Sequence, residues 1–129
     1  MKAEEIDQLV RLAKFDRTFR GERGDMLHFI SIAVQCMERY NENRDDGNLT
    51  ILCKTLFGLA NKYNMRVNRL EVREDTDNKT LSDTVYSMAK ICMTHYSIQK
   101  KIIILIGMFC NLCYRMEWDV IELYCRKVC

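Results

Sequence analysis

The chain has 129 residues, 48% of them hydrophobic and 29% charged, and this length suits a single domain with one hydrophobic core. Its formal net charge of +2 at pH 7 gives no reason to expect a nucleic acid or an anionic membrane as the partner. With no proline and only five glycines, the composition is typical of long helices with few tight turns, so we expect an all-α protein.

The first two expected helices are amphipathic, and the charged, glycine-containing segment 20–24 separates them. The apolar positions at helical spacing within residues 3–19 are Ile6, Leu9, Val10 and Ala13. In the second helix we expect Asp25 as the N-cap and a pattern that continues to Tyr40. Its expected inward stripe consists of Leu27, Ile30, Val34 and Met37. Residues 1–20 are thus expected to add an extra N-terminal amphipathic helix to a single domain of residues 1–129.

The third and fourth expected helices follow the polar segment 41–47. Asn48 is the expected cap of the third helix, and the acidic run 74–78 is expected to form a loop after it. The apolar positions of the third helix are Leu52, Leu56, Leu59, Tyr63, Val67 and Leu70. Thr80 is the expected N-cap of the fourth helix, with Asp83 at the capping-box position. The residues expected to point inward from it are Leu81, Val85, Met88, Ile91 and Cys92.

Residues 102–114 carry no charge, and this stretch could be a membrane span, a buried strand or a core helix. Thirteen helical residues measure only about 20 Å, against a hydrocarbon core of about 30 Å. A strand would lack a partner, because no other segment reads as a convincing strand. We therefore predict a central hydrophobic helix over about residues 99–116, after a break at 94–97, and a short final helix over residues 118–128.

This order of helices resembles the Bcl-2 family of apoptosis regulators over about residues 25–128, in two places. Residues 52–63 are similar to the family's third homology motif. The positions that keep its pattern are Leu52, Leu59, Ala60, Lys62 and Tyr63. Leu56 and Phe57 replace the family's central Gly-Asp, which argues against a death-promoting role for this helix. At the start of the fifth helix, Lys101 keeps the positive charge of the family's Asn-Trp-Gly-Arg junction.

The resemblance implies a bundle of six to seven helices that inhibits apoptosis by sequestering the homology-3 helix of a pro-apoptotic protein in a surface hydrophobic groove. The implied groove residues are Leu56, Leu59 and Tyr63 on one wall, Val85 and Met88 on the other, Ile102 and Leu105 on the floor, and Lys101 facing an acid of the ligand. Short chains of this kind are similar to those of large DNA viruses. The resemblance therefore implies an intracellular viral protein in the host cytoplasm, or one held peripherally at mitochondria.

A structural or adaptor bundle that acts through homodimerisation is the alternative function. The apolar positions of the implied groove are equally those that the core of such a bundle would use, and Lys101 is also typical of a solvated charge near a helix start. The high apolarity of residues 102–113 disfavours a death-fold adaptor. A virion scaffold, joined through the first helix or the terminal cysteines, remains open.

The seven cysteines are expected to be mostly buried free thiols, because the opening Met-Lys-Ala-Glu-Glu has no apolar signal segment and most of the cysteines lie in apolar helical patterns. The pairs Cys110/Cys113 and Cys125/Cys129, with His95, have spacings compatible with zinc. Neither pair lies in a turn-rich knuckle, so we expect no metal. Cys125 and Cys129, on a short polar terminal helix, are candidates for an intermolecular disulfide.

Catalysis is not expected from this sequence, and neither is a cofactor. His28 and His95 are far apart, and no nucleophile motif or glycine-rich phosphate loop occurs. Basic residues alternate with acidic ones along the chain, so a nucleic-acid-binding face is not indicated.

Overall fold

The computed structural model describes residues 3–13, 21–66 and 80–126, and these residues form six α-helices and no strand. The helices are α1 (Ala3–Leu12), α2 (Glu22–Asn43), α3 (Gly47–Lys62), α4 (Leu81–Cys92), α5 (Ile98–Arg115) and α6 (Val120–Cys125). The prediction of an all-α bundle is therefore confirmed. The expected acidic loop 74–78, with Val67, Leu70 and Cys129, lies outside the described residues.

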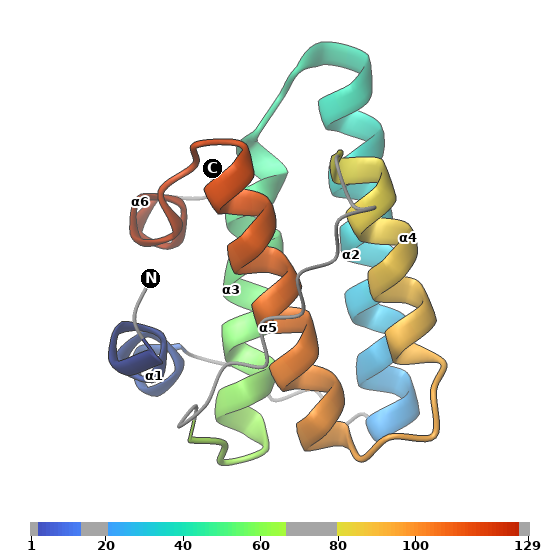
Figure 1. The fold of residues 1–129 in the computed structure, drawn as a ribbon, viewed down its shortest axis with the longest axis vertical. Coiled ribbons are helices and arrows are strands. Elements are labelled where there is room, and N and C mark those ends of the chain that lie inside the picture. The colour runs from blue at the N-terminus through green and yellow to red at the C-terminus, as the bar shows by residue number, and fades with distance from the viewer. Residues whose placement is uncertain (1–2, 14–20, 67–79, 127–129) are drawn as a thin grey trace.

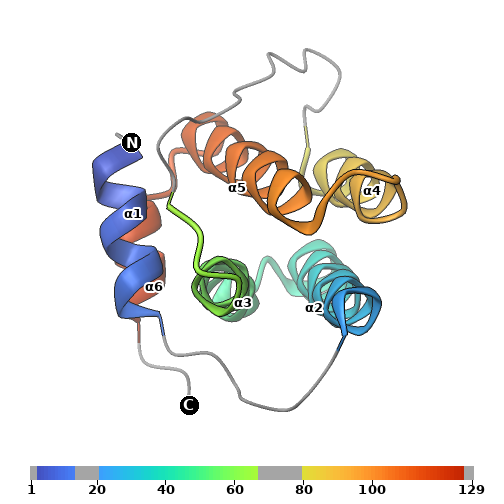
Figure 2. The ribbon, with the colours of Figure 1, turned by 90° about the horizontal axis from the view of Figure 1, so that it is seen from below.

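Four of the helices form a bundle, and the other two cover one side of it. α2 packs against α3 and α4, and α5 packs against the same two helices from the opposite side. Seen from below, α2, α3, α5 and α4 therefore occupy the corners of a square (Figure 2). α1 and α6 both pack against α3, on the side away from α2 and α4 (Figures 1 and 2). α3 is thus as central as α5, because it contacts helices on three of its sides.

The core is one cluster of apolar side chains with members from all six helices. α5 contributes the largest share of aliphatic residues, and it is buried on nearly every side along its middle. Its buried residues are Ile98, Ile102, Ile104, Leu105, Ile106, Gly107, Phe109, Leu112 and Cys113. The predicted core helix is therefore confirmed, with bounds one residue earlier at each end than expected. Within the described residues no helix has both the length and the apolarity that a membrane crossing requires.

The buried face of α2 differs from the predicted one by one residue. Its buried apolar positions are Met26, Phe29, Ala33 and Cys36. The predicted inward stripe begins at Leu27, whose side chain is 59% exposed, and its other members are only half-buried. A step of one residue turns a helix by about 100°, so the predicted stripe lies beside the buried one. The sequence contains both stripes, and spacing alone does not distinguish them.

The beginning of α2 also differs from the prediction. The helix starts at Glu22 with Gly21 as the N-cap, four residues before the expected N-cap. Asp25 is not a cap but a fully buried residue of the first turn. Its carboxylate instead reaches the end of α3, where it forms the ion pair described below.

Three helix starts are stabilised by side-chain caps. Thr80 accepts a hydrogen bond from the backbone N–H of Asp83 (3.1 Å), which confirms the predicted N-cap of α4. Ser97 accepts one from the N–H of Lys100 (3.2 Å) and begins α5 directly after the predicted break. Asp119 accepts from Ile121 (2.9 Å) and starts α6 two residues later than expected. Polar residues at these positions therefore define the starts of α4, α5 and α6.

α3 is shorter than predicted at its C-terminus. It ends at Lys62, and Asn64 has a left-handed backbone (φ 52°). The N–H of Met65 donates to the carbonyl of Ala60 (3.0 Å), and that of Asn64 donates to Asn61 (2.9 Å). These two bonds form a Schellman motif, which terminates a helix by satisfying its last carbonyls. At the other end Asp46, and not Asn48, is the N-cap.

Candidate binding surfaces

The six apolar residues of the predicted groove all lie in the hydrophobic core, with side chains 4% exposed or less. They are Leu56, Leu59, Val85, Met88, Ile102 and Leu105. α2 packs against both α3 and α4, so it lies between the two predicted walls and opposite the predicted floor on α5 (Figure 2). The structure thus brings these residues together, but a ligand helix would reach them only if α2 were displaced.

Lys101, the predicted anchor for the ligand's acid, is half-buried at the first turn of α5. Its Nζ donates a hydrogen bond to the backbone carbonyl of Cys92 (3.2 Å), the last residue of α4. A cation at this position satisfies a free carbonyl and complements the negative end of the α4 dipole. Lys101 therefore has a structural partner within the α4–α5 connection.

Tyr63, the remaining predicted groove residue, takes part in a buried polar cluster with Asp25 and Lys62. The Asp25 Oδ2 atom accepts hydrogen bonds from Lys62 Nζ (2.7 Å) and from the hydroxyl of Tyr63. Burial, and secondly the hydrogen bond to Asp25, raise the pKa of Tyr63 well above its usual value. The cluster joins the first turn of α2 to the end of α3, and we call it the Asp25 cluster.

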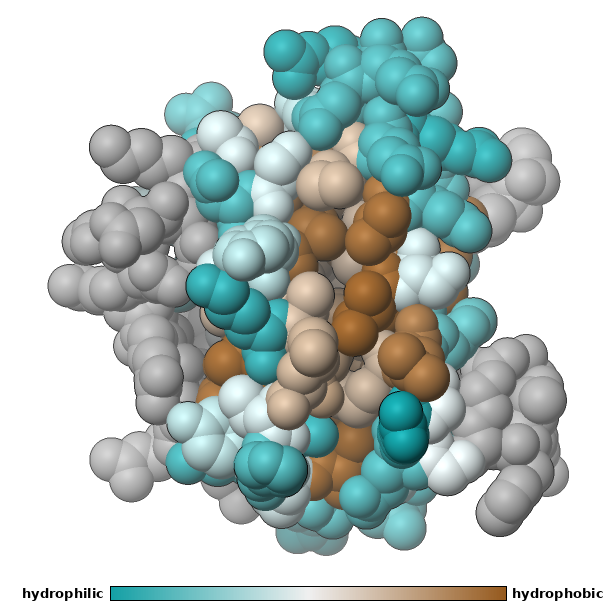
Figure 3. Space-filling model, turned by 90° about the vertical axis from the view of Figure 1, so that its right-hand side faces the viewer, coloured by the Kyte–Doolittle hydropathy of each residue, from teal (hydrophilic) through white to brown (hydrophobic). Residues whose placement is uncertain are grey.

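A strip of apolar side chains lies on the surface where α2 and α4 run side by side, and we call it the α2–α4 strip. Figure 3 shows it as a brown and tan band between hydrophilic margins. Helical spacing places in it Leu27, Ile30, Val34 and Met37 from α2, Tyr86 and Ala89 from α4, and Met93, which directly follows α4. Tyr86 and Met93 are 66% and 79% exposed. Contiguous apolar side chains of this kind mark interaction surfaces more often than scattered ones do.

The two helices of the strip run in opposite directions, and charged residues flank it unevenly. Asn41, near the end of α2, donates a hydrogen bond to Ser82, near the start of α4 (3.0 Å). At this end the exposed charges bordering the strip are acidic, with Glu38 on α2 and Asp83 on α4. Towards the other end they are basic, with Arg23 on α2 and Lys90 on α4. The strip therefore has an acidic end and a basic end.

Sequence reasoning missed this strip, although the signal was present. Residues 26–37 carry two adjacent apolar stripes, and a single helix needs only one of them to join a core. The second stripe is surplus apolar surface. Such a surplus is a recognisable sign of a second contact face, even where the sequence does not show which stripe is buried.

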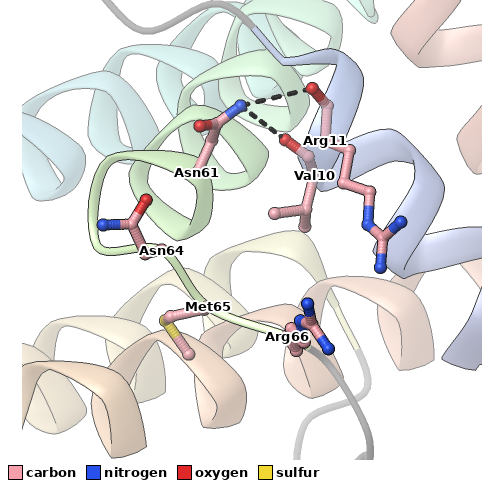
Figure 4. A pocket seen from close by; sticks show the side chains of 6 residues that line it. All are labelled: Val10, Arg11, Asn61, Asn64, Met65 and Arg66. Carbon is pink, nitrogen blue, oxygen red and sulfur yellow. Dashed lines mark hydrogen bonds between the residues drawn. The ribbon is translucent and has the colours of Figure 1, made fainter.

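A separate pocket of about 330 Å³ lies between the end of α1 and the turn after α3 (Figure 4). The residues that line it are Val10, Arg11, Asn61, Asn64, Met65 and Arg66. The Asn61 side-chain amide donates to the backbone carbonyls of Val10 (2.8 Å) and Ala13 (2.6 Å), at the end of α1. One amide of α3 thus holds the last turn of α1 in place and defines one side of the pocket.

The cysteines of the core are free thiols, and burial raises their pKa values. The pKa is raised to about 12 for Cys36 and to about 11 for Cys92. Across the described ranges, no group of three or more His, Cys, Asp or Glu side chains is suited to hold a metal ion. Cys125 is exposed, and Cys129 lies outside the described residues, so their disulfide remains a prediction.

Comparison with known proteins gives no further guide to function, because no protein-family model, no curated protein and no solved structure matches this chain.

Proposed function

We propose that this protein is a non-catalytic binding domain that pairs with a second copy of itself through the α2–α4 strip, and so acts as a homodimeric adaptor. The observation that supports the proposal is the continuity of the strip. Its exposed apolar side chains come from two neighbouring helices and lie in one band (Figure 3). Covering them removes apolar surface from water, which is the main favourable contribution to association.

The distribution of charge favours a second copy as the partner. A twofold axis that lies in the interface and crosses the middle of the strip at right angles to its length would turn the second copy end for end. The acidic end of one strip, with Glu38 and Asp83, would then face the basic end of the other, with Arg23 and Lys90. Complementary charges of this kind fix the register of an interface and suppress other arrangements.

The resemblance to apoptosis regulators suggests a different occupant, the homology-3 helix of a pro-apoptotic protein. Such a helix presents apolar residues at i, i+3 or i+4, and i+7, and α2 presents the same spacing at Leu27, Ile30 and Val34. The six apolar residues of the implied groove are buried, so binding of such a helix without rearrangement would require the strip. Sequestration is therefore the outcome that competes with self-association.

We expect Leu27→Glu to shift the protein from dimer to monomer. The side chain is 59% exposed, so the change leaves the core intact, but it places a carboxylate within each apolar strip, facing the acidic end of the other copy. Sedimentation equilibrium under reducing conditions would measure the change, with a dissociation constant raised by about a hundredfold. Tyr114→Glu is the matched control, because Tyr114 is 86% exposed on α5 and lies outside the strip. Equal dissociation constants for the two variants would contradict the proposal.

A charge exchange tests the register of the two copies. Arg23→Glu alone is expected to weaken the dimer, because it places two acidic residues opposite each other. Combining it with Glu38→Arg should restore association, since the two α2 charges then exchange signs and are again opposite across the interface. A double variant that is weaker than either single variant would rule out the end-for-end arrangement.

A panel of homology-3 peptides tests whether the strip binds a pro-apoptotic helix and not a second copy of the chain. Calorimetry at micromolar peptide should show no binding that depends on Leu27 if the strip serves self-association. Sequestration would be favoured over self-association by two results together. The wild-type protein would sediment as a monomer, and it would bind a peptide in a way that is lost in Leu27→Glu and kept in Tyr114→Glu.

A further inference from the structure

We propose that the pocket between α1 and the turn after α3 binds a small phosphate monoester. This site lies apart from the α2–α4 strip, and the proposal does not depend on self-association. It rests on the charge of the residues that line the pocket, on their hydrogen-bond partners and on the size of the cavity.

The lining of the pocket is positively charged. Among the six described residues that line it, two carry guanidinium groups and none carries a carboxylate. Figure 4 shows the side chains of Arg11 and Arg66 extending to the same side of the pocket. Arg11 also pairs with Asp7 one turn earlier on α1 (3.0 Å), which holds its side chain in place and offsets part of its charge. Arg66 is exposed and adds a second cation beside it.

Both nearby helices end at this pocket, and helix C-termini ordinarily repel anions. Here the last carbonyls are already engaged. The amide of Asn61 donates to the carbonyls of Val10 and Ala13, and the N–H of Met65 donates to the carbonyl of Ala60. Among the described residues that line the pocket, Arg11 and Arg66 are the charged ones.

The chemistry of the lining favours a phosphate over a carboxylate. A phosphate monoester carries a charge between −1.5 and −2 near neutral pH and has three acceptor oxygens. It can therefore pair with two guanidinium groups at once. A carboxylate carries a single negative charge, which balances the charge of only one guanidinium group.

The floor of the pocket suits a short organic group on the phosphate. Val10 and Met65 are apolar and almost fully buried. The volume of about 330 Å³ is at the lower end of the range for small-molecule sites. A ligand of the size of phenyl phosphate would place its ring on this floor and its phosphate at the arginines.

Titration of the ¹⁵N-labelled protein with phenyl phosphate tests the proposal. We expect saturable shifts of the backbone signals of residues 10, 11 and 64–66, with a dissociation constant below about 10 mM. Inorganic phosphate should bind more weakly, because it lacks the apolar group. Phenol should not bind, because it lacks the charge.

Arg66→Gln is expected to lower the affinity for phenyl phosphate about tenfold or more, since it removes a charged bidentate donor. Arg39→Gln, a change of an exposed arginine on α2, serves as the control and should bind as the wild type does. Three outcomes would each overturn the proposal: no saturable shift at the pocket, an unchanged affinity in Arg66→Gln, or phenol bound as tightly as phenyl phosphate. Arg66 is exposed in a turn, so its replacement is not expected to disturb folding.

Discussion

Lys62→Met is expected to lower the free energy of unfolding by about 3–5 kcal/mol, because it leaves a buried carboxylate without its cation. Asp25 is fully buried, and its Oδ2 atom lies 2.7 Å from Lys62 Nζ. Its other oxygen, Oδ1, has no hydrogen-bond partner among the described residues. After the substitution only the hydroxyl of Tyr63 would still donate to the carboxylate. Urea unfolding at neutral pH would measure the difference.

Two further variants show whether the uncompensated charge is the cause. In the double variant Asp25→Asn with Lys62→Met the buried charge is gone, so most of the lost stability should return. Lys90→Met, which changes an exposed lysine of α4, should alter stability by no more than about 0.5 kcal/mol. If the double variant were as unstable as Lys62→Met, lost packing of the lysine stem would explain the effect instead.

Raising the pH from 8 to 10 is expected to destabilise the protein by about 4 kcal/mol through four buried thiols. They are Cys36, Cys53, Cys92 and Cys113. Burial raises the pKa of each from its ordinary value of 9.0, to about 12 for Cys36 and to about 11 for Cys92. Below pH 9 the thiols are protonated in both states. Between pH 9 and the raised pKa it is mainly the unfolded chain that loses protons, so the stability falls, by about 1 kcal/mol per thiol at pH 10.

Single substitutions separate the thiols from other alkaline effects. In Cys36→Ala the difference in unfolding free energy between pH 8 and pH 10 should shrink by about 1 kcal/mol. The small cavity that the substitution creates costs the same at both pH values, so it cancels in this difference. Cys125 is exposed, and Cys125→Ala should leave the pH dependence unchanged. Urea titrations with reductant present would test this, and an unchanged difference in Cys36→Ala would contradict it.

Most of the fold could be predicted from the sequence, because its signals are local. Thr80 and Ser97 cap their helices, because their side-chain hydroxyls accept hydrogen bonds from the backbone N–H groups three residues further along the chain. The apolar run of α5 is too short for a bilayer and too isolated for a strand, and it forms the expected core helix. The end of α3 was missed, because Asn64 adopts a left-handed backbone within a pattern that continues at helical spacing.

The candidate sites were much less predictable, because each depends on residues that are distant in the sequence. The pocket lies between the end of α1 and the turn after α3, and the sequence of neither segment predicts that it contacts the other. The six apolar residues of the predicted groove lie in the core, and whether a ligand could reach them depends on where α2 packs. Spacing identifies apolar positions on a helix but does not tell a core residue from a binding residue.

α2 shows most clearly where local information ends. Residues 22–43 specify a helix with two apolar stripes, and helical spacing is satisfied by either one. Packing selects the stripe that contains Phe29, because turning it inward also brings Asp25 to Lys62 and Tyr63, which are 37 and 38 residues further along the chain. The stripe that contains Leu27 is left on the surface as a consequence. Its exposure, and with it the candidate binding surface, therefore follows from contacts between helices and not from the order of residues within one.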